Sequence, residues 1–261
     1  MAKYGLTIDV EKCCGCYACF LSCRDEYSGK SHLPTAAAQP EGHQWIRVEE
    51  IEHGTGSKVK VDYVPWVCRH CGDPECVKNA PAGAAFKRDD GIVIFDPEKS
   101  KGWDSAQKAC PHGVVFWNQG AGIPQKCTLC AHMRDAGEKA TRCSECCPTG
   151  AIVYGEIPES VDGLVQILGI PQPFLAGEVA YADLPSEPAE GVTVRLLDES
   201  GALLSECKTN FLGDFEFNGL AADCFYQIII ERDKYISKEI TLELRSSTNL
   251  GTIMLSGREE N

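Results

Sequence analysis

The chain has 261 residues and an excess of acidic side chains, 38 Asp and Glu against 25 Lys and Arg, which gives a net charge of −13. That balance argues against a nucleic-acid partner, because neutralising phosphates takes clustered cations that this sequence lacks. Sixteen cysteines without an apolar leader at the start favour metal ligation over a secreted disulfide scaffold, and no stretch approaches the roughly eighteen apolar residues of a membrane helix, so we expect no direct membrane insertion.

The first cysteine group lies near the start of the chain. Cys13, Cys16, Cys19 and Cys23 have the spacing C-x2-C-x2-C-x3-C. In bacterial ferredoxins the first three thiolates of such a run hold one [4Fe–4S] cluster and the fourth ligates a neighbouring cluster. A zinc site is the alternative, but it would need two well-separated C-x2-C pairs. The run therefore predicts an iron–sulfur protein.

An insertion and an incomplete cysteine group come next. Residues 24–67 separate the first two groups, and an insertion of that length is a candidate contact surface for a partner. Cys68, Cys71 and Cys76 then follow without a fourth member, and Cys110 stands alone before a proline. This arrangement has the form of ferredoxin runs from which some ligands have been lost.

An internal repeat explains the missing ligands. The segment IDVEKCCGC at 8–16 aligns with FDPEKSKGW at 95–103. In this register Ser100 and Trp103 occupy positions that hold cysteines in the first copy. Ala106, three residues after Trp103, occupies the position of the next cysteine of that copy. None of these three side chains can serve as a thiolate ligand.

A second repeated box identifies the fourth substituted position. CPTGAI at 147–152 and CPHGVV at 110–115 match APAGAA at 80–85, so Ala80 stands where the other two copies have a cysteine. The four substituted positions together would have formed one cluster under crossed ligation. We therefore predict that one complete cluster site has been lost, whereas its neighbour keeps all four cysteines.

The last cysteine group completes the crossed arrangement. It has Cys127 and Cys130, then Cys143 and Cys147 after a longer interval. The predicted ligand sets are Cys13, Cys16, Cys19 and Cys147 for cluster 1; Cys127, Cys130, Cys143 and Cys23 for cluster 2; and Cys68, Cys71, Cys76 and Cys110 for cluster 3. The cysteines predicted not to be ligands are Cys14, Cys146, Cys207 and Cys224. We assign no catalytic residue, and His70 and His112 are expected to neighbour cluster 3 without ligating it.

The C-terminal third differs from the cysteine-rich part in its sequence pattern. Residues 156–173 contain several prolines and glycines around a short apolar run and are predicted to form a linker, with room for one short helix. From residue 174 onward, short alternating segments predict about seven strands between Leu175 and Leu255, with turns at 198–201 and 211–214. This part has no constellation of ligands or nucleophiles, so we interpret it as a packing or docking module.

Residues 1–155, with four cysteine groups and the run KCTLCAH, resemble the iron–sulfur subunits of molybdopterin oxidoreductases of the dimethyl sulfoxide reductase family. Ordinary members carry four clusters, so the lost site is a departure from the family. The segments GHQW at 42–45, DGIVIFDPEKSKG at 90–102, QKCTLCAH at 125–132 and NFLGDFEF at 210–217 extend the resemblance over nearly the whole chain, to members that act on hydroxylated aromatics.

The resemblance implies an α+β chain in two domains. Residues 1–155 would be a duplicated bacterial two-cluster ferredoxin-like domain with three [4Fe–4S] clusters, followed by the linker 156–173 and, at 174–261, an all-β seven-stranded transthyretin-like sandwich or barrel. It also implies a large catalytic partner with molybdenum on two pterin guanine dinucleotides, while this chain transfers electrons in the cytoplasm. A small subunit of a related catechol dehydroxylase or resorcinol hydroxylase, and a free-standing polyferredoxin, are the alternatives.

Overall fold

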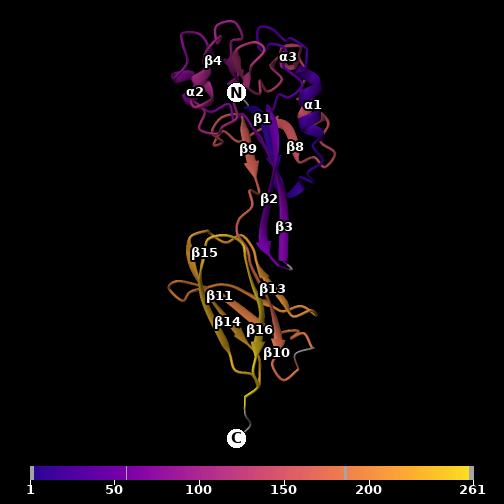
Figure 1. The fold of residues 1–261 in the computed structure, drawn as a ribbon, viewed down its shortest axis with the longest axis vertical. Helices are drawn as coiled ribbons and strands as arrows, with labels where there is room; N and C mark the ends of the chain where they lie inside the picture. The colour runs from indigo at the N-terminus through magenta and orange to yellow at the C-terminus, as the bar shows by residue number, and fades with distance from the viewer. Residues whose placement is uncertain (1–2, 57, 185–186, 259–261) are drawn as a thin grey trace. The chain divides into compact units, whose positions relative to one another are not determined.

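The computed structural model describes residues 3–56, 58–184 and 187–258. The chain divides into two compact units, one of Met1–Ile51 with Asp62–Ile170 and the other of Glu52–Val61 with Pro171–Asn261. In both units the strands outnumber the α-helices, and the α-helices of the described residues are few and short (Figure 1). No helix in the described ranges combines the length and the apolar character needed to cross a bilayer.

The first unit repeats one local arrangement around its cysteines. Strands β1, β5 and β7 each lead into a cysteine run or its substituted copy, and strands β8, β4 and β6 each follow a repeated box. The pairs, all antiparallel, are β1 (Tyr4–Asp9) with β8 (Ile152–Glu156), β5 (Val93–Phe95) with β4 (Ala85–Lys87), and β7 (Ile123–Gln125) with β6 (Phe116–Asn118). The box glycines Gly83, Gly113 and Gly150 have φ angles of +73°, +60° and +67°, which glycine adopts most readily. Each box can therefore turn the chain from a ligand position into the next strand.

Short helices carry or flank several cysteines. They are α1 (Ala18–Tyr27), α2 (Glu75–Lys78), α3 (Ala131–Asp135) and α4 (Arg142–Glu145), together with the 3₁₀ turns η1 (Val10–Lys12) and η2 (Asp104–Gln107). Helix α4 begins with a capping box in which Thr141 and Ser144 exchange side-chain and backbone hydrogen bonds. This cap fixes the start of the helix and so positions the buried Cys143 in its first turn.

The predicted linker contains a strand instead of a short helix. Strand β9 (Val165–Leu168) pairs in parallel with β1, and Leu164 and Val165 are buried. A Cβ atom at Gly5 would lie 2.0 Å from the carbonyl oxygen of Leu164, so only glycine allows this close approach. The prediction of a linker over 156–173 is thus wrong for its central part, because burial beside β1 outweighs the local prolines and glycines.

The insertion between the first two cysteine groups forms a hairpin. Its strands are β2 (Ile46–Thr55) and β3 (Lys58–Val67), and residues 52–61 at its tip belong to the second unit. There the ammonium of Lys58 lies 2.6 Å from the Asp214 carboxylate, and Lys60 also pairs with Glu216. Trp45, just before the hairpin, is buried in the first unit. Part of the insertion therefore serves internal packing, and its role as a contact surface for a partner stays a prediction.

The rest of the second unit is a sandwich of two sheets. Between residues 175 and 255, leaving aside 185–186, it has seven strands: β10 (Leu175–Tyr181), β11 (Thr193–Asp198), β12 (Leu203–Lys208), β13 (Asp214–Phe217), β14 (Cys224–Glu231), β15 (Lys238–Leu244) and β16 (Thr248–Leu255). The sheet orders are β13-β10-β16 and β12-β11-β14-β15, so the strands form no closed barrel. Strands β10 and β16 run parallel, whereas the other strand pairs of these two sheets are antiparallel.

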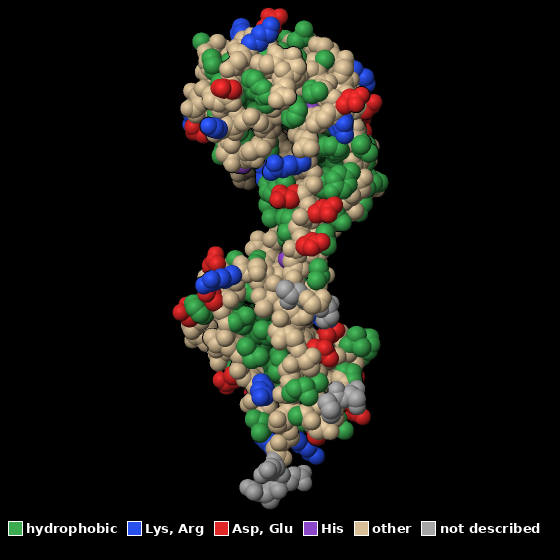
Figure 2. Space-filling view, viewed as in Figure 1, with side chains coloured by type: hydrophobic (Ala, Val, Ile, Leu, Met, Phe, Trp, Pro, Cys, Tyr) green, Lys and Arg blue, Asp and Glu red, His purple; other side chains and the backbone are tan. Residues whose placement is uncertain are grey.

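The core of this unit follows the predicted alternation. Val192, Val194 and Leu196 are fully buried, as is Leu244 on β15. Of the two cysteines in this unit, Cys207 is half-buried and Cys224 is exposed. On the face shown in Figure 2, Lys and Arg side chains lie scattered among acidic and hydrophobic ones.

Candidate metal centres

The four cysteines of set 3 surround one narrow cavity in the first unit. Cys68, Cys71, Cys76 and Cys110 line it, together with His70 and Lys126. Cys68 follows β3, Cys76 lies in α2, and Cys110 is the first residue of a repeated box. The Sγ atom of Cys68 accepts a hydrogen bond from the backbone N–H of His70 at 3.5 Å. The loop after β3 thus brings a thiol and a backbone N–H together beside this cavity.

The cysteines of set 2 line a second cavity, with mostly apolar walls. Cys127, Cys130 and Cys143 share it with Cys23, which lies in α1 and more than a hundred residues earlier in the sequence. Leu6, Trp45 and Leu129 are among the residues that enclose it. The structure therefore brings the fourth cysteine of the first run to the last cysteine group, which is the juxtaposition that crossed ligation requires.

The members of set 1 come together at the other end of α1. Burial raises the pKa of Cys13, and the nearby thiols of Cys14, Cys147 and Cys16 add to this effect. Burial also raises the pKa of Cys19 to about 12, with further contributions from Cys146, Cys13 and Cys147. These effects indicate that Cys13, Cys16, Cys19 and Cys147 lie near one another, with Cys14 and Cys146 in the same neighbourhood.

Cys147 and Cys146 differ in their surroundings. Burial opposes ionisation of Cys147, but hydrogen bonds, among them one from the backbone N–H of Ile152 at 3.4 Å, outweigh it and lower the pKa of Cys147. Cys146 instead has its Sγ atom 3.0 Å from the hydroxyl of Ser22. Amide donors that stabilise a thiolate are typical of a ligand, so these contacts favour Cys147.

The donor chemistry of the three sets fits iron–sulfur clusters. None of the sixteen cysteines is in a disulfide. Burial and neighbouring thiols raise the pKa of Cys127 to about 12 and of Cys76 to about 11. Buried thiols that repel one another as anions need a strong local positive charge to ionise together, and a cluster's iron ions supply it.

The substituted site is filled by apolar side chains. Trp103, Ala80 and Ala106 belong to one hydrophobic cluster, in which the Trp103 ring lies 5.1 Å from the ring of Phe95, centroid to centroid. Ser100 is fully buried, and its hydroxyl has no hydrogen-bond partner among the described residues. These four positions offer no thiolate and therefore do not fit a cluster.

His70 presents an unpaired donor beside set 3. Its ring is fully buried, and its Nδ1 atom accepts a hydrogen bond from the backbone N–H of Val93 at 3.0 Å. Burial lowers the pKa of His70 well below its usual value, so the single proton of the neutral ring is on Nε2. Nε2 has no partner among the described residues, and a sulfur acceptor nearby would satisfy it. His112 lines the same cavity from an exposed position.

A polar network near set 2 escaped prediction from the sequence. The carboxylate of Glu26 accepts hydrogen bonds from Arg142 at 2.7 Å and from His132 at 2.9 Å. The ring of His32 stacks on that of His132 with centroids 3.9 Å apart. Arg142 already neutralises the carboxylate, and the network joins α1, α3 and α4. Its one local signal was His132, two residues after Cys130.

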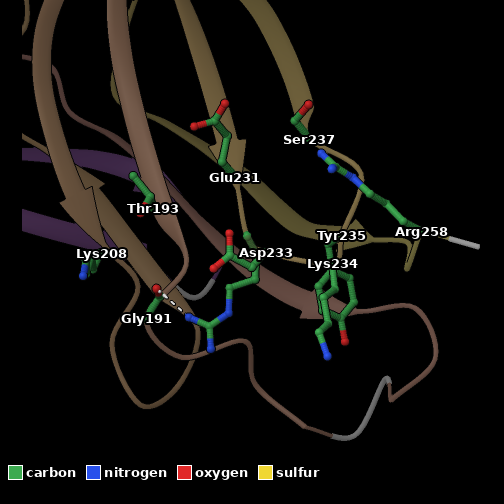
Figure 3. Close-up of a pocket in the computed structure, with 10 residues that line it drawn as sticks. Gly191, Thr193, Lys208, Glu231, Asp233, Lys234, Tyr235, Ser237 and Arg258 are labelled. Carbon is green, nitrogen blue, oxygen red and sulfur yellow. Dashed lines mark hydrogen bonds between the residues drawn. The ribbon is translucent and has the colours of Figure 1, made fainter. Parts of the chain in front are cut away.

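The second unit has a polar surface hollow of a different character (Figure 3). Its lining residues are Gly191, Thr193, Lys208, Glu231, Arg232, Asp233, Lys234, Tyr235, Ser237 and Arg258. Arg232 donates a hydrogen bond to the carbonyl oxygen of Gly191 at 2.9 Å. The lining contains no cysteine or histidine, so it offers none of the ligand types that gather in the first unit.

Comparison with known proteins adds a family assignment. Residues 59–157 match the family described as 4Fe-4S dicluster domain. The pyrogallol hydroxytransferase small subunit of Pelobacter acidigallici is 33% identical, over 98% of this chain and 100% of that protein. A putative dimethyl sulfoxide reductase iron–sulfur subunit of Halobacterium salinarum is 30% identical, over 61% of this chain and 68% of that protein. A subunit of the tetrathionate reductase of Salmonella typhimurium is 32% identical, over 60% of this chain and 59% of that protein.

The matched domain and the gathered cysteines define an iron–sulfur protein of the [4Fe–4S] class. The chain belongs to the family of iron–sulfur electron-transfer subunits of molybdoenzymes that includes the pyrogallol hydroxytransferase small subunit. The resemblance stated from the sequence is thereby confirmed.

Proposed function

We propose that this chain is the electron-transfer subunit of a heterodimeric molybdenum enzyme that acts on hydroxylated aromatics, of the type that transfers a hydroxyl group from pyrogallol to give phloroglucinol. The supporting observation is the extent of the similarity. The pyrogallol hydroxytransferase small subunit matches 98% of the chain, the second unit included, whereas the other two relatives match about 60%. A shared second unit favours a shared kind of complex.

We further propose three [4Fe–4S] clusters, held by the three cysteine sets given above. The clusters would supply one-electron transfer. The chain's own residues would ligate them, exclude water through walls such as Leu6, Trp45 and Leu129, and provide backbone donors to sulfur. Trp103 would occupy the place of a fourth cluster.

The catalytic step would belong to the partner. In the second unit Nδ1 of His53 lies 2.9 Å from the Ser247 hydroxyl, but Ser247 is buried and its hydroxyl also accepts a hydrogen bond from the backbone N–H of Phe174. Among the described residues that line the hollow of the second unit, Tyr235 is the one redox-active side chain. The large partner would bind the aromatic and carry molybdenum on two pterin guanine dinucleotides. In this proposal the strands from residue 174 onward serve assembly, and the complex is cytoplasmic.

Anaerobic purification through a tag on this chain tests the proposal. We expect a large molybdenum-containing subunit in a one-to-one ratio, and conversion of pyrogallol by the complex but not by the reconstituted chain alone. Conversion of catechol or resorcinol without pyrogallol turnover would transfer the assignment to a dehydroxylase or a hydroxylase. A chain that purifies without any large subunit would contradict the heterodimer and favour a free-standing carrier.

A further inference from the structure

Lys126 is a buried cation without a carboxylate partner. Its side chain is 3% exposed, and it directly precedes Cys127 of set 2. The ammonium donates hydrogen bonds to the backbone carbonyls of Val93 and, at 3.2 Å, of Cys127, and it lies 5.2 Å from the centroid of the Phe95 ring. In the described part of the chain these are its polar and ring contacts, and none of them carries a full negative charge.

The same ammonium lies between two of the cysteine sets. Lys126 lines the cavity of set 3 and is covalently joined to the first cysteine of set 2. Val93, whose carbonyl accepts a hydrogen bond from Lys126, lines the cavity of set 3 as well. Val67, which directly precedes Cys68 of set 3, lines the cavity of set 2. Sets 2 and 3 therefore adjoin, with Lys126 beside both.

The energetics require an anion near this ammonium. A buried charge without a counter-charge is strongly unfavourable, and two carbonyl dipoles and one aromatic face replace only part of the lost hydration. A [4Fe–4S] core with four thiolates has a net negative charge, which increases by one on reduction. Two such clusters beside Lys126 would supply the missing counter-charge, and the cation would reduce the repulsion between them.

We propose that Lys126 is a shared counter-charge of clusters 2 and 3, which stabilises their reduced forms and raises both reduction potentials relative to cluster 1. This inference rests on the proposed ligand sets. Its functional consequence is that an electron entering the chain would favour the adjoining pair of clusters over cluster 1. Lys126 thus affects electron transfer only indirectly, through the effect of its positive charge on the reduction potentials of these two clusters.

Lys12 offers a matched control. It directly precedes Cys13, the first cysteine of set 1, just as Lys126 precedes Cys127. Its side chain is 61% exposed, however, and its ammonium lies 2.7 Å from the carboxylate of Asp9. An exposed and already paired cation is screened by water, so removal of its charge should change no potential appreciably.

The test is a redox titration of the complete anaerobic complex, followed by electron paramagnetic resonance. We expect Lys126→Met to shift the potentials of clusters 2 and 3 to more negative values and to leave cluster 1 unchanged, whereas Lys126→Arg and Lys12→Met resemble the wild type. Unchanged potentials in Lys126→Met at full iron content would overturn the proposal, as would an equal shift of all three clusters.

Iron content separates this inference from the ligand assignment. The wild-type complex tests the ligand sets by itself, since three clusters predict about twelve irons in this chain. If Lys126→Met loses iron from clusters 2 and 3 but Lys126→Arg keeps it, the need for a positive charge is supported. Loss of iron in both variants would show a role in packing and would overturn the proposal.

Discussion

Replacement of Trp103 by alanine tests whether the lost cluster site has become part of the hydrophobic core. The side chain is 5% exposed and packs with Phe95, Ala80 and Ala106, while Cys76 and Cys110 of set 3 border the same hydrophobic cluster. Removing the indole ring would leave a cavity between short strands and loops that cannot close over it. A buried Trp→Ala change of this kind costs ~3–5 kcal/mol.

The matched control is Trp117→Ala. Trp117 lies on β6 and is only partly buried, so its removal exposes less new apolar surface and should cost less. We expect both variants to keep the iron of three clusters, because neither residue is a ligand. Trp103→Phe should fall between Trp103→Ala and the wild type, since the smaller ring fills part of the volume.

The assay is anaerobic unfolding of the complex in guanidinium chloride, followed by near-ultraviolet circular dichroism and by release of iron. Variants are compared by their transition midpoints, because cluster loss makes unfolding irreversible. Trp103→Ala should unfold at a clearly lower concentration than Trp117→Ala. Equal midpoints would refute the packing role, and loss of one complete cluster from Trp103→Ala alone would show that the residue supports a cluster instead of replacing one.

Three further predictions concern the cysteines and the second unit. Cys16→Ser should remove about four irons and lower the yield of folded chain, whereas the exposed neighbour Cys14 should tolerate the same change; equal losses, measured by iron analysis, would mean that the register is wrong. Cys147→Ser should abolish the signal of one cluster in resonance spectra and Cys146→Ser should not; the reverse pattern would exchange their roles. Truncation after Ile170, which keeps β9, should impair assembly with the large subunit more than turnover by the complex that still forms; normal assembly without turnover would give the second unit a direct part in activity.

The cysteine sets could be proposed from the sequence because spacing and repeats are properties of the covalent chain. Four substitutions fell together in one site, Ser100 among them, and the structure places Trp103, Ala80 and Ala106 in a single apolar cluster. The seven strands of the second unit were also predictable, since alternate residues such as Val194 and Leu196 must point to one buried face.

Features that depend on distant partners could not be predicted. Strand β9 is four residues long and forms beside β1, more than 150 residues away, at a place where Gly5 allows close approach. The parallel pairing of β10 with β16 likewise depends on the closure of the sandwich. The burial of Lys126 gave no local signal, because a lysine before a cysteine run is equally compatible with an exposed position, as Lys12 shows.

The most direct test of the three-cluster assignment is native mass spectrometry of this chain after gentle release from the anaerobic complex. We predict the mass of the polypeptide plus three [4Fe–4S] units, with Cys68→Ala, Cys23→Ala and Cys13→Ala each removing a different one. Binding of four units, or of two, would contradict the assignment of three complete cysteine sets and one lost site.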